Sequence, residues 1–313
     1  MAKKVLHITN GSSLTEYLHE LDFKGDFLTW QEALCEGPTI DKIDSERFFK
    51  LRTEFLRSTY DVDVNEEERR SELGKLDNID SYSEINLWFE YDLFCHINLL
   101  GVLNLIFQKK IDLPLFLICS GRVPGEKEMK GLSELTSNQL IKHYNDRVIL
   151  TEEDKEYADS IWRIYCGHDH NLLKPFIVQT SSFPYMASCL SAHMKRFPDS
   201  KSGLSAIEHN ILRLVRDNKI NSKHHLLGYA MNYQGYYGYG DIQLERIIDN
   251  LSPFFIFETD NIKLHRDGHE ALMGHHNFAA EIQNDIVYGG VKRLEFQFSK
   301  IKNKLIKTVI NAY

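Results

Sequence analysis

Long apolar runs, paired cysteines and an excess of basic residues are all missing from this chain of 313 residues. Without a run of about 18 apolar residues, no membrane-spanning helix is expected. The first apolar stretch stops at Asn10-Gly11, too soon for the apolar core of a signal peptide. Five scattered cysteines form no CxxC pair, which predicts free thiols in a reducing cytoplasm. With only 7 prolines and 18 glycines, the composition is globular and excludes collagen-like or disordered chains.

Positive charge is scarce where a nucleic-acid surface would need it. The net charge is −8, to which residues 1–200 contribute −10 and residues 201–313 contribute +2. Because Lys and Arg neutralise the phosphates in nucleic-acid complexes, the first 200 residues are poorly suited to that role and the last third only weakly suited. DNA is therefore not an expected partner.

The first 130 residues alternate strand-like and helix-like segments. Strands are predicted at 5–9, 27–30, 85–89 and 114–119. Helices are predicted between them, at about 13–21, 43–59, 65–76 and 92–107. This alternation predicts an α/β (Rossmann-like) domain over 1–130, with a mainly parallel sheet and flanking helices. The last strand is apolar throughout, which is typical of a strand buried on both faces.

The remaining residues predict three further parts. Residues 131–198 lose the strand signals and are expected to form a helical segment packed on the first domain. After a polar linker, 204–297 is expected to form a winged-helix-like α+β domain, because three helices precede a hairpin near Asp260-Asn261. Its third helix, about Asp241 to Leu251, is expected to be at least half covered by the rest of the chain. Residues 298–313 are predicted to form a basic amphipathic C-terminal helix.

Three segments of the sequence resemble a known family. They are Leu-His-Ile-Thr-Asn-Gly-Ser-Ser at 6–13, Leu-Thr-Trp-Gln-Glu-Ala-Leu-Cys-Glu-Gly-Pro at 28–38 and Leu-Trp-Phe-Glu-Tyr-Asp-Leu-Phe at 87–94. Their order and wording resemble the bacterial family named domain of unknown function 1835, over about residues 4–125. Residues 204–212 and 239–241 resemble the C-terminal part of its longer members. The family pattern has Asp after Asn-Gly where this chain has Ser12, so no role of that Asp carries over. The resemblance groups the chain and implies no mechanism.

Polar residues gather at the predicted carboxyl ends of the strands, where parallel α/β sheets bind ligands. Four strand ends would place them around one crevice. Gly11 lets the backbone approach a ligand, and the helix that follows offers free N–H groups to an anion. The ligand-binding candidates are Asn10, Gly11, Ser12, Ser13, Trp30 and Arg122.

Acidic side chains at the same ends are the catalytic candidates. Two adjacent carboxylates can split their pKa values and act as general acid and base, or they can hold Mg²⁺. Equally, Asp92 could cap the following helix while Glu90 pairs with a basic residue, and His7 could be a core residue. No metal site is predicted from the His and Cys spacing, and the cofactor stays unknown, with Mg²⁺ an open alternative. The catalytic candidates are Glu90, Asp92, Glu32, Glu36 and His7.

These patterns predict a cytoplasmic protein that binds a small phosphorylated or nucleotide-like ligand at its N-terminal strand ends. Hydrolysis or transfer of that ligand stays open. One alternative is a ligand-responsive transcription regulator with a DNA-binding winged helix, which the acids of the predicted third helix oppose. The other alternative is a protein-interaction adaptor without chemistry, so a protein partner also stays open.

Overall fold

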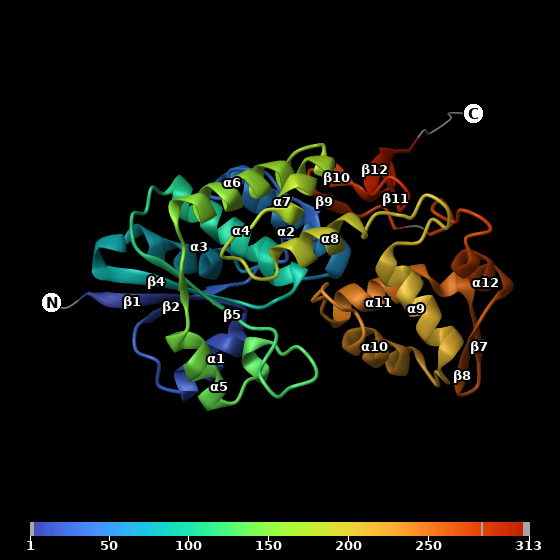
Figure 1. Ribbon diagram of the computed structural model, residues 1–313, viewed down its shortest axis with the longest axis horizontal. Helices are drawn as coiled ribbons and strands as arrows, with labels where there is room; N and C mark the ends of the chain where they lie inside the picture. The colour runs from blue at the N-terminus through green and yellow to red at the C-terminus, as the bar shows by residue number, and fades with distance from the viewer. Residues whose placement is uncertain (1–2, 283, 309–313) are drawn as a thin grey trace.

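A five-stranded sheet forms the centre of the N-terminal part of the molecule (Figure 1). The computed structural model describes residues 3–282 and 284–308. The strands lie in the order β2-β1-β4-β5-β6. The first four are parallel, and β6 is antiparallel to β5. Their bounds are β1 Lys4–Asn10, β2 Asp26–Trp30, β4 Tyr82–Phe89, β5 Leu115–Cys119 and β6 Val148–Ile149.

Helices cover both faces of this sheet, so the predicted α/β class is confirmed (Figure 1). One face packs on α1 and α5, whose Leu18 and Leu140 lie with Trp88 of β4 in one apolar cluster. The other face is buried by α2, α4 and α6, among others. The helix bounds are α1 Ser12–Glu20, α2 Glu46–Tyr60, α3 Glu66–Gly74, α4 Leu93–Gln108, α5 Ser137–Asn145 and α6 Glu152–Cys166.

The direction of the strand order reverses between β1 and β4. From β1 the chain moves outward to β2, then crosses back over the sheet to β4 and continues to β5. The connections after β1 and after β4 therefore leave on opposite faces of the sheet, and a crevice can open between them at the carboxyl ends. Asn10 ends β1 and Glu90 directly follows β4 at this point.

Helix α3 covers the free edge of β2. The backbone N–H of Thr29 donates to Glu72 Oε2 at 2.8 Å, and Lys75 Nζ donates to the carbonyl of Phe27 at 2.6 Å. Exposed strand edges invite pairing with other chains, so these two contacts protect the edge. They also hold α3 close to the carboxyl end of β2, beside a cavity lined by both elements.

The middle of the chain is mostly helical, as predicted, with one correction. Helices α7 Lys174–Val178 and α8 Met186–Met194 follow α6. Residues Val148 and Ile149, inside the predicted helical segment, instead form the edge strand β6 of the central sheet. A two-residue strand is too short to give a periodic signal. No described helix is long and apolar enough to cross a membrane.

Three helices and a hairpin follow the linker, in the predicted order. They are α9 Ala206–Asp217, α10 Lys223–Asn232, α11 Asp241–Asn250 and the antiparallel pair β7 Phe255–Glu258 and β8 Asn261–Leu264. Ile220, between α9 and α10, forms a bridge to Ile262 of β8. A further helix, α12 Arg266–Met273, comes after the hairpin and was not predicted.

The C-terminal helix predicted over 298–313 is wrong for the described residues to 308. Two strands, β11 Phe296–Ser299 and β12 Lys304–Lys307, form an antiparallel hairpin there instead. Phe296, Phe298 and Leu305 are buried, whereas Ile301, which the helix would have buried, is 85% exposed in the turn. Residues 309–313 of the predicted helix lie outside the described residues.

A small three-stranded sheet connects a segment of the N-terminal part to a segment near the C-terminus. Its strands β10 Val291–Lys292, β9 Val287–Gly289 and β3 Gly37–Pro38 lie in that order. The β3–β9 pair is parallel and is extended by a hydrogen bond from Thr39 N to Gly289 O of 3.0 Å. Residues 287–292, inside the predicted winged-helix-like domain, therefore pack on the N-terminal part.

Candidate ligand-binding site

A cavity of about 410 Å³ lies at the carboxyl end of β2, between the start of α1 and helices α2 and α3. Its volume falls within the range of about 300–1,000 Å³ that is usual for small-molecule sites. Ser12 and Trp30, both predicted ligand-binding residues, line it together with Glu32. Phe48 and Phe49 of α2 form an aromatic part of its wall.

Three buried polar side chains on the cavity wall carry atoms without a hydrogen-bond partner among residues 3–282 and 284–308: Trp30 Nε1, Glu32 Oε1 and both terminal nitrogens of Arg69. Trp30 is 4% exposed and Glu32 is 9% exposed. Arg69 lies 3.1 Å from Glu32 Oε1 as an ion pair, yet the two groups are not aligned for a hydrogen bond. Buried polar groups are normally paired, so unpaired atoms on residues that line a cavity make it a candidate ligand site.

Glu32 owes its position to a second arginine. Arg52 of α2 is fully buried and donates to Glu32 Oε2 at 3.2 Å. The same guanidinium also donates to the carbonyls of Ala33, Glu36 and Pro38. Arg52 thereby fixes the loop that follows β2 and engages Oε2 of Glu32, whose Oε1 contacts Arg69.

The start of α1 lies at the same cavity. Gly11 precedes the helix with φ of +94°, and its N–H donates to the carbonyl of Trp30 at 3.0 Å. Within the described chain, no side chain caps the first turn of α1, and a Cβ on Gly11 would meet nothing within 4 Å. Free N–H groups beside open space are the arrangement that binds anions at helix N-termini.

Asn10 connects this turn to α4. Its side chain donates to Cys95 Sγ at 3.0 Å and accepts from Asn98 Nδ2 at 2.9 Å. Asn98, fully buried, also donates to the carbonyl of Glu32 and accepts from Leu34 N. Asn10 therefore holds the β1 end and the loop after β2 in a fixed relation rather than presenting a free group.

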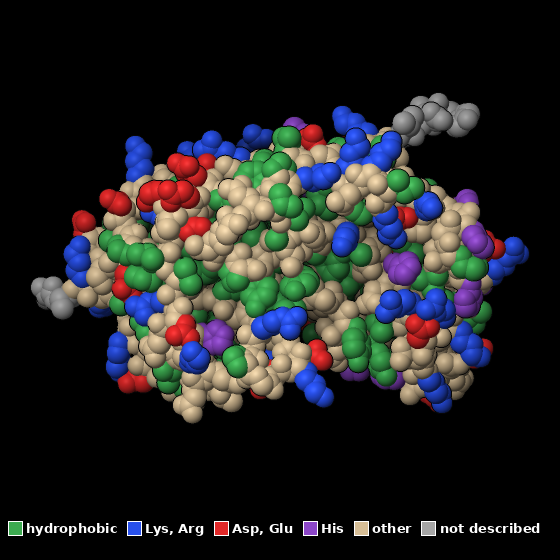
Figure 2. Space-filling model, in the orientation of Figure 1, with side chains coloured by type: hydrophobic (Ala, Val, Ile, Leu, Met, Phe, Trp, Pro, Cys, Tyr) green, Lys and Arg blue, Asp and Glu red, His purple; other side chains and the backbone are tan. Residues whose placement is uncertain are grey.

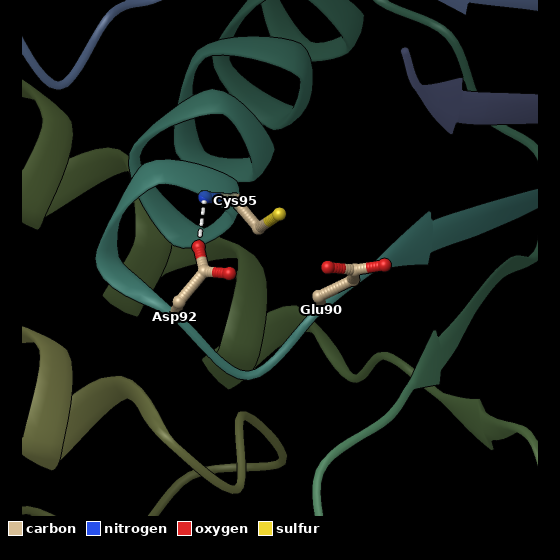
Figure 3. Close-up of side chains that lie close together, drawn as sticks. All are labelled: Glu90, Asp92 and Cys95. Atoms are coloured by element: carbon tan, nitrogen blue, oxygen red, sulfur yellow. Dashed lines mark hydrogen bonds between the residues drawn. The ribbon is translucent and has the colours of Figure 1, made fainter. Parts of the chain in front are cut away.

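A second cluster lies on the other side of this turn, where β4 passes into α4. Glu90, Asp92 and Cys95 each place one ligand-type atom within 4.8 Å of the others. Figure 3 shows the two carboxylates facing one another, with the thiol of the first helical turn beside them. Asp92 caps α4 by accepting from Cys95 N at 2.8 Å, which was one of the two roles that the sequence suggested for it. Two carboxylates can hold Mg²⁺, whereas the thiol favours a softer ion.

Burial shifts the acidities in this cluster. It raises the pKa of Glu90 to about 7, with the charge of Asp92 as the second cause. Burial raises the pKa of Asp92 to about 6, opposed by the backbone N–H groups that bind it. The pKa of the Cys95 thiol is raised well above its ordinary value by the same burial and by both acids. Two adjacent carboxyl groups with raised pKa values are a combination that acid–base catalysis can use.

Two distant segments cover the carboxylates. The backbone N–H of Leu132 donates to Glu90 Oε1 at 2.7 Å. From the C-terminal part, the loop 233–240 bonds to the start of α4, because Leu93 N donates to Tyr236 O at 2.8 Å. Gly238 of that loop packs directly on the Asp92 carboxylate, with no room for a Cβ. These contacts cover the two carboxylates with protein.

Glu36 lies in a third place. It is fully buried and its carboxylate contacts Tyr60 of α2 together with two residues of α11. Gln243 Nε2 donates to it at 3.0 Å and Arg246 at 2.9 Å. The carboxylate is fully paired, so it joins α11 to the N-terminal part instead of facing a ligand.

The structure places the other candidates apart from the cavity. His7 lies in the middle of β1, accepts from Trp88 Nε1 at Nδ1 and bonds to Lys24 O, and burial lowers its pKa. It is a core residue in this geometry. Arg122 lines a separate cavity of about 580 Å³ at the end of β5. Ser13 is exposed and does not line the cavity beside β2.

Sequence reasoning missed Arg52, which holds Glu32 in place, and Arg69, which lines the cavity beside β2. Arg52 had a detectable signal, because it lies on the apolar face of a helix, four residues after Phe48 and three before Phe55. A charged residue in that position needs a buried partner. Arg69 had no comparable signal, since it stands in a run of charged residues.

No protein-family model matches the chain, and no curated protein matches it either. The grouping with domain of unknown function 1835 stays a prediction.

Proposed function

We propose that the protein binds a small phosphorylated or nucleotide-like ligand in the cavity beside β2. The observation that carries this proposal is the set of unpaired, buried polar atoms on the described wall, from Trp30, Glu32 and Arg69. Leaving such an atom unpaired costs about 1–3 kcal/mol, so a ligand that pairs several of them gains affinity from each.

Two further features support a nucleotide-like ligand. The uncapped first turn of α1, beside Gly11, is suited to a phosphate. Glu32 follows the end of β2, the place from which an acidic residue binds the ribose hydroxyls in dinucleotide-binding α/β folds.

Calorimetry and thermal unfolding with nucleotides and sugar phosphates, with and without Mg²⁺, test the proposal. A ligand at 100 times its Kd adds about 2.7 kcal/mol to stability, which a melting curve detects readily. R69M is expected to lose binding about ten- to hundredfold, because a charged donor is removed. R70M is the matched control, since Arg70 is the next residue of α3, also lies over Phe49 and pairs with Glu46 outside the cavity. If nothing in the panel binds, the proposal is refuted.

A second candidate function is hydrolysis or transfer at Glu90 and Asp92. The raised pKa values of this pair, at the reversal point of the sheet, favour it. Turnover of a bound nucleotide that is abolished in E90Q, with binding retained, would support it. Unchanged turnover in E90Q would remove Glu90 from consideration.

We further propose that α9–α11 and β7–β8 form a winged-helix-like unit that packs within the molecule rather than binding DNA. The exposed residues of α11 are Asp241, Ile242, Glu245 and Asp249, three of them acidic. On the face drawn in Figure 2, Lys and Arg side chains are interspersed with acidic and apolar ones. The DNA-binding regulator and the protein-interaction adaptor are the alternatives. All five cysteines are free, which fits the reducing cytoplasm as the place of action.

A further inference from the structure

We infer that the cavity takes the uncharged base of a nucleoside, and that any phosphate lies outside it, beside Gly11. This inference rests on the proposed function and assigns the two ends of the ligand to two places. It separates base recognition from phosphate recognition, which the proposed function leaves open.

The pairing needs of the wall decide between the two groups. Trp30 Nε1 and Arg69 Nη1 are donors without an acceptor in the described chain, whereas Glu32 Oε1 has only its ion-pair contact with Arg69 Nη2, at 3.1 Å. A fully ionised phosphate offers only acceptors, so it could not donate to Glu32 and would compete with Glu32 for Arg69 while placing two negative groups together. A nucleobase carries N–H and C=O or ring nitrogen acceptors on one edge, so it can satisfy both kinds of atom.

The charge of the wall supports the same assignment. Among the described residues that line the cavity, Arg69 is the only one with a basic side chain. Glu72 is held by Lys75 and by the backbone of Thr29, and it stays part of the acidic wall. An anion would enter against this excess of negative charge, whereas an uncharged base would not. The acidic lining residues are Glu16, Glu32, Asp63, Glu68 and Glu72.

Aromatic surface suits a flat, apolar ring. Phe48, Phe49 and Trp30 all contribute to the wall. Stacking of a base on such side chains contributes about five- to 150-fold in affinity per base. The open space at Gly11 and the hydroxyl of Ser12 then lie on the side where the sugar and phosphate would leave the cavity.

Calorimetry of the full chain with four nucleosides, ribose 5-phosphate and inorganic phosphate tests the assignment. We expect at least one nucleoside to bind, within about tenfold of the affinity of its 5′-monophosphate. Ribose 5-phosphate and inorganic phosphate are expected to bind at least a hundredfold more weakly, and the nucleoside affinity is expected to change less than twofold between low and moderate salt. Tight binding of ribose 5-phosphate, or displacement of a nucleotide by inorganic phosphate, would overturn the assignment and leave the proposed function standing.

Two variants test the contacts themselves. W30F removes one neutral donor that has no described protein partner, and we expect it to weaken nucleoside binding about three- to tenfold. R69M is expected to weaken nucleoside binding about ten- to hundredfold, and R70M to leave it unchanged. Nucleoside binding that is unaffected by both W30F and R69M would refute the inference. Failure of every nucleoside and nucleotide to bind would refute the proposed function as well.

Discussion

Burial determines the chemistry of Glu90. Burial and the nearby charge of Asp92 disfavour the ionised form and raise the pKa to about 7 from 4.5, although the N–H of Leu132, which donates to the carboxylate, opposes this shift. In the unfolded chain water solvates the same group, which therefore releases its proton at lower pH. Between about pH 4.5 and 7 the folded state binds more protons than the unfolded state, so the free energy of unfolding falls as the pH rises.

Replacing Glu90 by Gln removes this titration while keeping an oxygen that accepts from Leu132. We expect the stability of E90Q relative to wild type to increase by on the order of 1–3 kcal/mol between pH 4.5 and 7.5, measured by urea unfolding. E54Q provides the control, because Glu54 is exposed on the same domain. A constant difference between E90Q and wild type over this range would show that Glu90 is not buried as described.

Individual site residues were predictable where the chain direction alone fixes them. Glu90 and Asp92 directly follow an apolar strand, so their place at the sheet edge follows from sequence. The fate of Glu36 does not, because its partners Gln243 and Arg246 are more than 200 residues away. His7 alternates with apolar neighbours in a way that fits either a ligand or a core residue, and only the contacts of Trp88 and Lys24 distinguish them.

At the scale of elements, the loop 233–240 depends on a glycine that packs on Asp92. Gly238 and Gly235 both have positive φ, at +65° and +71°. A Cβ at Gly238 would overlap the Asp92 carboxylate, whereas a Cβ at Gly235 meets no described atom within 4 Å. The two positions therefore share backbone strain and differ in space.

G238A is expected to destabilise the protein by about 1–3 kcal/mol more than G235A, because only the first must displace a packed side chain. G235A itself should cost on the order of 1 kcal/mol from the left-handed backbone. Chemical denaturation of both variants at pH 7 measures the difference. Equal losses would mean that the loop does not rest on Asp92.

The periodic elements were predictable and the irregular ones were not. The strands at 4–10, 26–30, 82–89 and 115–119 have strong apolar runs that tertiary contacts reinforce. The C-terminal hairpin was misread because positions 301, 305 and 306 also fit a helical period. Asn303 adopts φ of +46° in the turn, which a helix does not allow, and the burial of Phe296 and Phe298 against distant residues selects the strand.

At the scale of the whole molecule, a buried ion pair connects the N-terminal part to α11. Glu36 is fully buried, the Arg246 side chain is 18% exposed, and Arg246 also donates to Asn284 Oδ1 at 2.8 Å. Removing one partner of a buried pair leaves an uncompensated charge and typically costs about 3–5 kcal/mol. The two parts should therefore unfold together.

A double-mutant cycle of E36Q and R246M measures this connection. We expect the stability losses of the two single variants to add up to more than the loss of the double variant. The difference, which is the coupling energy, should be on the order of 1–3 kcal/mol in equilibrium unfolding. The exposed pair Glu46–Arg70 serves as the reference and should give about 0.2–1 kcal/mol. Additive effects of E36Q and R246M would contradict the described contact.

The packing of α11 on the N-terminal part also affects whether this helix could bind DNA. Its Gln243 and Arg246 are committed to Glu36, and six of its ten residues are at least partly covered, as the sequence predicted. The exposed remainder is mostly acidic. We expect the full chain to show no salt-dependent binding to duplex DNA in fluorescence anisotropy at low ionic strength. Micromolar binding that falls steeply with added salt would instead favour the regulator.

The parallel pairing of β3 with β9 has a consequence for synthesis on the ribosome. Gly37 and Pro38 leave the ribosome some 250 residues before Tyr288 and Gly289, their partners, and Glu36 leaves 210 residues before Arg246. At a synthesis rate of about 5–20 residues per second, Arg246 is translated roughly 10–40 s after Glu36. During that interval the nascent α/β region carries a charge that its finished fold buries. We expect it to remain protease-sensitive until nearly the whole chain has been translated, and to become resistant in a single late step.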